Sequence, residues 1–299
     1  DGTDELVARL VQADERIRTV RNPDVDIPIG LNLAIRASSN PIVVRVDAHS
    51  ELEPGYTTAA VDALERTGAV NVGGVMLAKG KTPFQTAVAR AYNSKFGLGG
   101  ARYHGGATEG PAESAYLGVF RRDVLDAVGL FDESIRRGED WELNLRIRGA
   151  GHLVWFDPAL EVTYWPRENW RKLARQFFAT GVWRGELVRR YGGRNPWRFF
   201  APPLLVLAVA LSIIIGVLQL TRVLHGSPSV FASAIYLAPL AYLLLILVVS
   251  LVQDEVAVWR HRWLFLIVLP TMHLSWGIGF MVALLRGARQ FTDTSRTGI

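Results

Sequence analysis

Two short stretches of the sequence combine acids with a spacing that suits catalysis. In the first, the largely apolar residues 42–46 lead into Asp47 and His49, which stand two positions apart. Side chains two apart in an extended chain point to the same side, so this carboxylate and imidazole can converge on one ion. Carboxylates suit Mg²⁺ or Mn²⁺, and an added imidazole favours Mn²⁺. The alternative is a strand that ends in an Asp-containing turn, with a histidine on the surface.

The second stretch places Glu139 and Asp140 at the start of a predicted helix. Residues 141–147 have helical spacing, and glycines at 149 and 151 can end the helix. Acids in a first helical turn are commonly complements to the helix dipole. Capping and chemistry are therefore both open for this pair.

The elements that must position these acids alternate along the chain. Apolar spacing predicts helices at 4–12, 31–37, 56–67 and 83–92, and strands at 17–20, 42–46 and 70–76. This order predicts an α/β domain with an open sheet of parallel strands covered by helices. In such sheets ligands gather at the carboxyl ends of the strands, where Asp47 is expected.

The last third of the chain has a different composition. The protein has 299 residues, a formal net charge of +5 and 49% hydrophobic residues, and charge is scarce after residue 199. Apolar runs at 200–220, 231–252 and 263–285 approach the roughly 20 residues that a membrane-spanning helix needs. The third run contains Pro270, His273 and Ser275, so it is either a kinked span or a helix partly sheltered by its neighbours.

The distribution of arginines predicts the orientation of these spans. Four arginines precede the first run (Arg189, Arg190, Arg194 and Arg198), and Arg260 and Arg262 separate the second from the third. The positive-inside rule then places the preceding domain in the cytoplasm. With three spans, however, the basic tail after residue 285 would face outward, against the rule. Either the third segment does not fully cross or the tail is an exception.

Other classes of function are disfavoured by composition. The chain has no cysteine, which excludes disulfides and thiolate metal sites. The excess of basic residues is explained by the positions that flank the membrane segments rather than by binding to nucleic acid, because no recognition module in the sequence carries a stripe of basic and aromatic residues. Residues 171–191 mix apolar positions with arginines, as a helix lying in the membrane interface does.

Several sequence blocks together resemble the family 2 glycosyltransferases of GT-A fold, and within them the ExoA-like succinoglycan glucosyltransferase group. The blocks are VRVDAH (44–49), TPFQTAVARAYNSKFGLGGARY (82–103), AYLGVFRRDV (115–124), VGLFDE (128–133), EDWELNLRIRGAG (139–151), YWPR (164–167) and ARQFFATGVWR (174–184). The resemblance implies a Rossmann-like, nucleotide-sugar-binding catalytic domain at 1–166, interfacial helices at 167–198 and a membrane domain at 199–299. It also implies that a strand, a helix and most of a second strand are missing before Asp1.

The resemblance implies a role for each matched acid. Asp47 resembles the first acid of an Asp-x-Asp motif, with His49 in place of the second, and together they would hold Mn²⁺ or Mg²⁺ against the donor diphosphate. Asp140 is similar to the general base that takes the acceptor proton, giving inversion at the sugar. Partial burial beside Trp141 would keep this base effective at a helix start. Glu139 would orient the site.

Further positions follow from the same resemblance. Glu142 is expected to be as readily a surface acid as a site residue, and Glu113 to be an acid near the acceptor or an ordinary loop residue. The loop 97–110 is expected to be a lid. Asn22 and Asn32 are expected on the donor nucleotide side. Three residues of the interfacial helix are expected to close over the diphosphate or the acceptor: Gln176, Trp183 and Arg184.

The sequence thus predicts a membrane-anchored, inverting transferase at the cytoplasmic face of a bacterial-type cell membrane. It would move one sugar from a UDP-linked donor to a lipid-linked acceptor. The Gln-x-x-Arg-Trp signature of processive synthases is absent, because Gln176 is followed by Phe-Phe-Ala-Thr. The alternatives are a polyprenyl-phosphate sugar synthase, whose acceptor needs no base, and a noncatalytic membrane scaffold that retains the fold.

Overall fold

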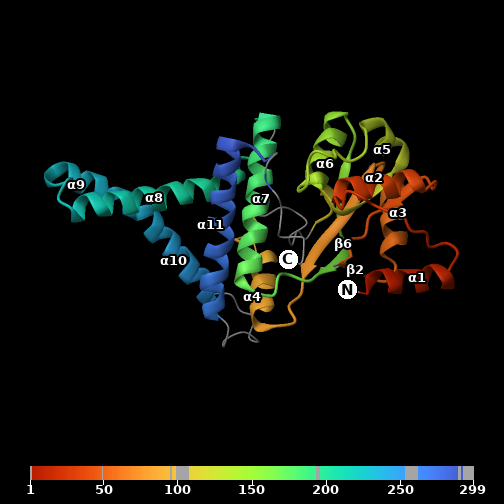
Figure 1. Cartoon of the computed structure of the whole chain (residues 1–299), viewed down its shortest axis with the longest axis horizontal. Coiled ribbons are helices and arrows are strands. Elements are labelled where there is room, and N and C mark those ends of the chain that lie inside the picture. The colour runs from red at the N-terminus through yellow and green to blue at the C-terminus, as the bar shows by residue number, and fades with distance from the viewer. Residues whose placement is uncertain are drawn as a thin grey trace.

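A mixed sheet forms the centre of the first half of the chain (Figure 1). The computed structural model describes residues 2–48, 50–94, 96–98, 108–192, 196–252, 262–288 and 291. The sheet has the order β1-β5-β3-β6-β2, with β4 also paired to β6. The strands are β1 (Ile42–Val44), β2 (Ser50–Leu52), β3 (Asn71–Ala78), β4 (Gly110–Pro111), β5 (Tyr116–Arg121) and β6 (Val154–Tyr164).

The prediction of parallel strands was wrong for most of this sheet. Among the strand pairs of the described residues, only β3 and β6 run parallel, and the β1–β5, β3–β5, β2–β6 and β4–β6 pairs are antiparallel. An apolar run shows that a strand is buried but not which way its neighbour runs. The register of β3 shifts at Gly73 and Gly74, where a Cβ on Gly74 would meet the backbone of Leu160 in β6.

The helices of this domain lie mostly where the sequence predicts them. They are α1 (Thr3–Ala13), α2 (Ile27–Ala37), α3 (Tyr56–Thr67), α4 (Pro83–Tyr92), α5 (Arg122–Val128) and α6 (Glu139–Gly149). The helix α4 begins sharply because Thr82 accepts a hydrogen bond from the Gln85 N–H and Pro83 occupies the first turn. Residues 17–20 form no strand, and both Ile17 and Val20 are exposed there.

The long helix α7 (Trp170–Tyr191) connects the sheet domain to a group of apolar helices. The group consists of η3 (Trp197–Phe200), α8 (Ala201–Leu220), α9 (Gly226–Ala232), η4 (Ser233–Tyr236), α10 (Leu237–Val252) and α11 (Arg262–Arg286). In Figure 1, α7 and α11 lie side by side, while α8 and α10 extend away from them toward α9. Within the described residues, 197–220, 226–251 and 262–286 are long and apolar enough to cross a membrane.

The contact between α7 and α11 is unusually close. Gly181 and Gly185 of α7 face the backbone of α11 at Trp276 and Phe280, and Gly279 of α11 faces the backbone at Phe178. Any Cβ at these three glycines would collide with that backbone. Small residues permit this approach, so the two helices pack as one unit.

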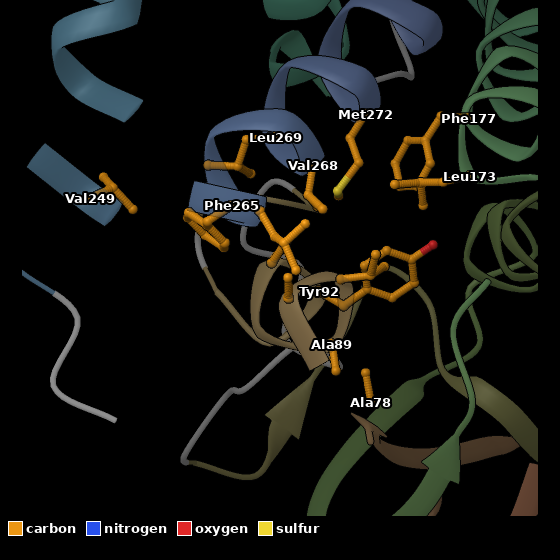
Figure 2. Packing of buried hydrophobic residues seen from close by; sticks show 14 of the residues in the cluster. Ala78, Ala89, Tyr92, Leu173, Phe177, Val249, Phe265, Val268, Leu269 and Met272 are labelled. Carbon is orange, nitrogen blue, oxygen red and sulfur yellow. The ribbon is translucent and has the colours of Figure 1, made fainter. Parts of the chain in front are cut away.

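One hydrophobic core joins the sheet domain to the apolar helices. Figure 2 shows Ala89 and Tyr92 of α4 packed beneath Val268 and Met272 of α11, with Phe177 of α7 beside them. All five side chains are buried. Burial of apolar surface on this scale stabilises by about 1.5–3 kcal/mol for each large side chain, so the two parts of the chain are held together by their cores.

Candidate active site

A large cavity opens where the sheet domain meets α7 and the apolar helices. Its volume is about 1010 Å³. Its lining includes the acids Asp47, Glu139 and Asp140. Residues of α8, α10 and α11 from the apolar group also line it. The cavity therefore brings together two acid stretches that are far apart in the sequence.

Asp47 reaches this cavity from the exit of β1. Its side chain is partly exposed, and both of its oxygens accept hydrogen bonds from Arg45, at 2.9 Å from Nε and 3.2 Å from Nη2. Alternation along an extended chain explains why Arg45 and Asp47 share a side. The partner expected for Asp47, His49, lies outside the described residues.

Arg45 also bridges the two acid stretches. Its Nη2 lies 3.1 Å from Oε1 of Glu139, and both side chains are buried. Burial alone would lower the pKa of Arg45, but the carboxylates of Glu139 and Asp47 outweigh it and raise that pKa. The guanidinium therefore stays charged and ties the start of α6 to the exit of β1.

Asp140 lies in the first turn of α6, directly after Gly138 and Glu139. Gly138 has a φ of 80°, a left-handed conformation that favours glycine and turns the chain into the helix. The Trp141 N–H donates to Oδ1 of Asp140 at 2.7 Å. Burial and the neighbouring Glu139 carboxylate raise the pKa of Asp140 above its ordinary value. A carboxylate with a raised pKa is a stronger base, which suits proton abstraction.

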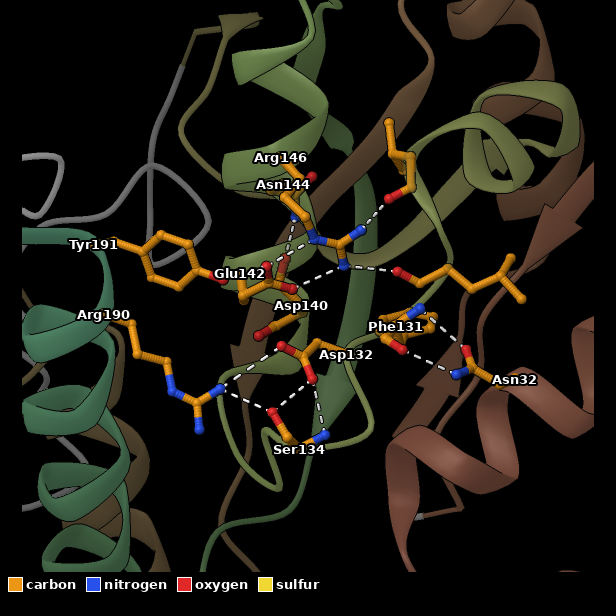
Figure 3. Close-up of polar contacts among 12 residues, drawn as sticks. Asn32, Phe131, Asp132, Ser134, Asp140, Glu142, Asn144, Arg146, Arg190 and Tyr191 are labelled. Carbon is orange, nitrogen blue, oxygen red and sulfur yellow. Dashed lines mark hydrogen bonds and ion pairs between the residues drawn. The ribbon is translucent and has the colours of Figure 1, made fainter. Parts of the chain in front are cut away.

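Glu142 is not a surface acid, which is one of the two roles that the sequence predicts for it. It is fully buried, and its carboxylate accepts hydrogen bonds from Arg146 at 2.7 and 2.8 Å and from the Tyr191 hydroxyl at 2.7 Å (Figure 3). Arg146 in turn donates to the carbonyls of Val128 and Leu130. This network joins α6 to α7 and to the end of α5, so Glu142 has a structural role.

Arg184 of α7 lies against two aromatic rings in the lining of the cavity that also contains Asp140. The Arg184 guanidinium lies 5.2 Å from the ring centroid of Trp141 and 4.5 Å from that of Phe199. All three residues line the cavity. Cation–π contacts of this kind hold a guanidinium in a fixed plane. Trp141 and Arg184 thus lie where the sequence predicts site residues.

Gln176 also lines the cavity, held by hydrogen bonds on both sides. Its Nε2 donates to the Tyr164 hydroxyl at 3.2 Å, and its Oε1 accepts from Arg167 at 3.1 Å. Glu113 lies at the rim, where its Oε2 forms a 2.6 Å ion pair with Nη2 of Arg198. This pair links the loop after β4 to the segment that enters α8.

Three predicted positions do not line the cavity. Asn32 is buried, and its amide donates to the Phe131 carbonyl and accepts from the Phe131 N–H, which fixes the turn before α6 (Figure 3). Asn22 donates to the Asp26 carbonyl at 2.8 Å ahead of α2. Trp183 is buried between α6, α7 and α11. In this arrangement the amide of Asn32 is bonded within the fold instead of lining the cavity.

Several cavity residues were missed by sequence reasoning. Arg45 has a signal that was overlooked, namely an arginine inside an apolar strand at position i−2 to the acid. Arg137 stands two residues before Glu139, is buried and donates to the Thr180 hydroxyl at 3.2 Å. Arg167 belongs to the matching block at 164–167 but has no individual role predicted from the sequence. Together with Arg184 and Arg198, these residues give the cavity wall a basic character.

Comparisons with known proteins show the family of this chain. Residues 1–129 match the model of glycosyl transferase family 2. The succinoglycan biosynthesis protein ExoA of Rhizobium meliloti (strain 1021) is 30% identical over 221 residues, which cover 73% of this chain and 67% of that protein. The chain belongs to glycosyltransferase family 2.

A solved structure shows the same fold for this glycosyltransferase. The mannosyltransferase PcManGT from Pyrobaculum calidifontis, solved with GDP-Man and Mn²⁺, superposes with a TM-score of 0.57 at 17% identity. The superposition covers 96% of this chain and 75% of that one. The predicted GT-A fold is confirmed, as is the recognition of an ExoA-like member of the family.

Proposed function

We propose that this glycosyltransferase moves one sugar from a UDP-linked donor to a lipid-linked acceptor at the cytoplasmic face of a membrane, with inversion at the sugar. The observation that carries the proposal is the continuity of the cavity. Asp47 and Asp140 line the same cavity as Leu205 of α8, Tyr242 of α10 and Met272 of α11. A charged donor and an apolar acceptor can therefore meet in one space.

The proposed chemistry is a single displacement with Asp140 as general base. The acceptor hydroxyl attacks the anomeric carbon of the donor and passes its proton to the Asp140 carboxylate. The bond from that carbon to the phosphate oxygen breaks, and the nucleoside diphosphate leaves with the electron pair. The raised pKa of Asp140 supports this role because it increases the affinity of the carboxylate for the transferred proton.

The residues present fit a divalent cation, Mn²⁺ or Mg²⁺. Asp47 offers carboxylate oxygens on the cavity wall, and such cations are commonly held by one or two carboxylates together with phosphate oxygens. Among the described residues no three His, Asp or Glu side chains form a group that would hold a metal unaided. Asp47, with His49, would hold the ion, which when bound neutralises charge on the departing diphosphate. The Mn²⁺ in the PcManGT structure supports this choice.

The basic wall of the cavity suits the same donor. Arg137, Arg167 and, from α7, Arg184 line it. Guanidinium groups bind phosphate oxygens in paired geometry and do not lose their charge. The same arginines would also bind a lipid phosphate acceptor, which is the second candidate: a polyprenyl-phosphate sugar synthase.

A donor and acceptor screen tests the proposal. Purified full chain in lipid nanodiscs is heated with UDP-sugars, GDP-sugars and free UDP, each with and without Mn²⁺, because selective binding to the folded state raises apparent stability. The best donor, radiolabelled in its sugar, is then incubated with extracted polyprenyl-diphosphate-linked glycans or with polyprenyl phosphate. Metal-dependent stabilisation by a UDP-sugar and transfer to the glycan are expected. Stabilisation by GDP-sugars alone, or transfer only to polyprenyl phosphate, would overturn the donor or the acceptor assignment.

A further inference from the structure

The helix α11 is apolar enough to cross a membrane, yet it is packed against the catalytic domain along its length. Near its start, the Arg90 guanidinium of α4 lies 5.2 Å from the Phe265 ring centroid. In its middle, Nε2 of His273 donates to the Phe96 carbonyl at 2.8 Å. Beyond its end, the Ala288 N–H donates to Oε2 of Glu186 at 3.1 Å. Groups of the catalytic domain therefore contact α11 near its start and in its middle, and Glu186 of α7 contacts the segment just beyond its end.

The neighbouring helix α7 is also packed against α11. It lies alongside α11 in Figure 1 and contacts it through Gly181 and Gly185. Lys172 near its start and Arg189 near its end are both exposed. A charge at the centre of a bilayer costs several kcal/mol, and charges at both ends of α7 need water or headgroups. If α11 crossed the membrane, α7 and part of the catalytic domain would have to cross with it.

The exposed surface of α11 differs from that of α8 and α10. One face of α11 is covered by protein, and the opposite face is apolar and exposed at Trp263, Ile267 and Ile278. In contrast, Pro203 and Ser212 are the buried residues of α8, whose remaining surface is accessible and mostly apolar. An apolar surface all round suits the interior of a bilayer, whereas a single apolar face suits its boundary.

We infer that α11 does not cross the membrane but lies on its catalytic-side surface, with this apolar face (Trp263, Ile267 and Ile278) against the acyl chains. Of the described segments, only 197–220 and 226–251 then cross, as a hairpin. At a rise of 1.5 Å per residue their lengths of 24 and 26 residues exceed the roughly 30 Å of the hydrocarbon core.

The charge distribution agrees with this two-span arrangement. Arg262 and Arg286 stand at opposite ends of α11. A spanning α11 would put Arg286 and the later arginines of the sequence, Arg289 and Arg296, on the far side, against the positive-inside rule. An α11 that lies flat keeps all of these residues on the side of the catalytic domain, and only Arg222, in the turn between α8 and α9, is on the far side.

Single cysteines test the sidedness of α11 without background, because the chain has none of its own. Arg286→Cys marks its far end, Lys172→Cys marks the catalytic side, and Val223→Cys marks the hairpin turn. Each variant is placed in sealed, oriented membrane vesicles and treated with a membrane-impermeant maleimide. Labelling of position 286 from the same side as 172, and of 223 from the other side, is expected. Labelling of position 286 together with 223 would overturn the inference.

Depth measurements provide a second, independent test. Spin labels on Ile267→Cys, Ile278→Cys and Leu285→Cys report their immersion through the ratio of collisions with oxygen and with a water-soluble nickel complex. A flat α11 gives a similar shallow depth at all three positions. A spanning α11 gives a maximum near position 278 and shallow values at its ends, which would contradict the inference even if some variants label poorly.

Discussion

Nε of Arg45 donates a hydrogen bond to Oδ1 of Asp47 at 2.9 Å, so the acid proposed to bind a divalent cation is already paired with a cation of the chain. The same guanidinium contacts Glu139, which precedes the proposed base. Arg45 thus sets both the position of Asp47 and the charge around Asp140. A bound metal must compete with it for the oxygens of Asp47.

Replacement of Arg45 by Gln should therefore separate stability from metal binding. Glu139 would lose its buried ion pair with Arg45, and the loss of one partner of such a pair costs up to about 3–5 kcal/mol. Asp47 would bind Mn²⁺ at lower concentration because its internal competitor is gone. Denaturant unfolding and Mn²⁺ titration monitored by thermal shift measure the two effects. Arg66→Gln, which removes an exposed ion pair with Glu109, serves as the control and should change neither.

Asp140→Asn should lower kcat by about 10²- to 10⁴-fold, the usual contribution of a general base. The amide has nearly the same size and still accepts the Trp141 hydrogen bond, so the KM for the donor should stay close to that of the parent. Steady-state kinetics with the identified donor measure both constants. Asp126→Asn, at an exposed position in α5, is the matched control. Full turnover of the Asp140 variant would favour a phosphate acceptor, which needs no base.

The pH profile should show the raised pKa of Asp140. The base must be ionised, so kcat/KM falls as the pH drops through this pKa, at a higher pH than for an ordinary aspartate. Glu139→Gln removes a neighbouring negative charge and should move this acid limb to lower pH. An unchanged limb in that variant would mean that another group controls the profile.

The same shift predicts the sign of a stability change. Because the pKa of Asp140 is raised in the folded state, the folded protein binds the proton more tightly than the unfolded chain, and stability falls as pH rises through that range. Asp140→Asn should therefore raise the Tm near neutral pH, with a difference from the parent that vanishes in acid. Thermal unfolding at several pH values measures it, and a variant less stable than the parent at neutral pH would contradict the prediction.

The contact between α7 and α11 should be sensitive to a single methyl group. A Cβ at Gly181 would collide with the Trp276 carbonyl, so Gly181→Ala should lower the Tm. Gly149, at the end of α6, has open space around its Cβ position. Gly149→Ala should instead stabilise slightly, by about 0.5–1 kcal/mol, because it removes backbone freedom from the unfolded chain. Equal effects in the two variants would show that the helices are not in tight contact.

The sequence predicted those elements that local signals define. The helix at 56–67 lies between Gly55 and Gly68, and the helix at 83–92 follows a Thr-Pro start. Both were placed correctly because capping and turn residues act over a few positions. Strand direction depends on partners far along the chain, which is why the antiparallel pairing of β5 with β1 and β3 was missed.

Site prediction had a similar limit. Asp47 and Asp140 were predicted as site residues from their resemblance to the family's motifs, because their spacing alone left a turn and helix capping open, and both line the cavity. Glu142 was misjudged because α6 is covered on several sides, so that even a polar position is buried in a network with Arg146. Asn32 looked like a ligand-binding residue for the same reason, since the sequence does not show which polar groups are bonded within the fold.

The shared core in Figure 2 has a practical consequence. Phe265, Val268 and Met272 of α11 pack on Ala89 and Tyr92 of α4, so the hydrophobic core of the catalytic domain is incomplete without α11. A fragment that ends at residue 192 would expose this apolar surface and aggregate. Biochemical work therefore requires the intact chain in detergent or nanodiscs. Inheritance of the two halves as separate, exchangeable modules is disfavoured for the same reason.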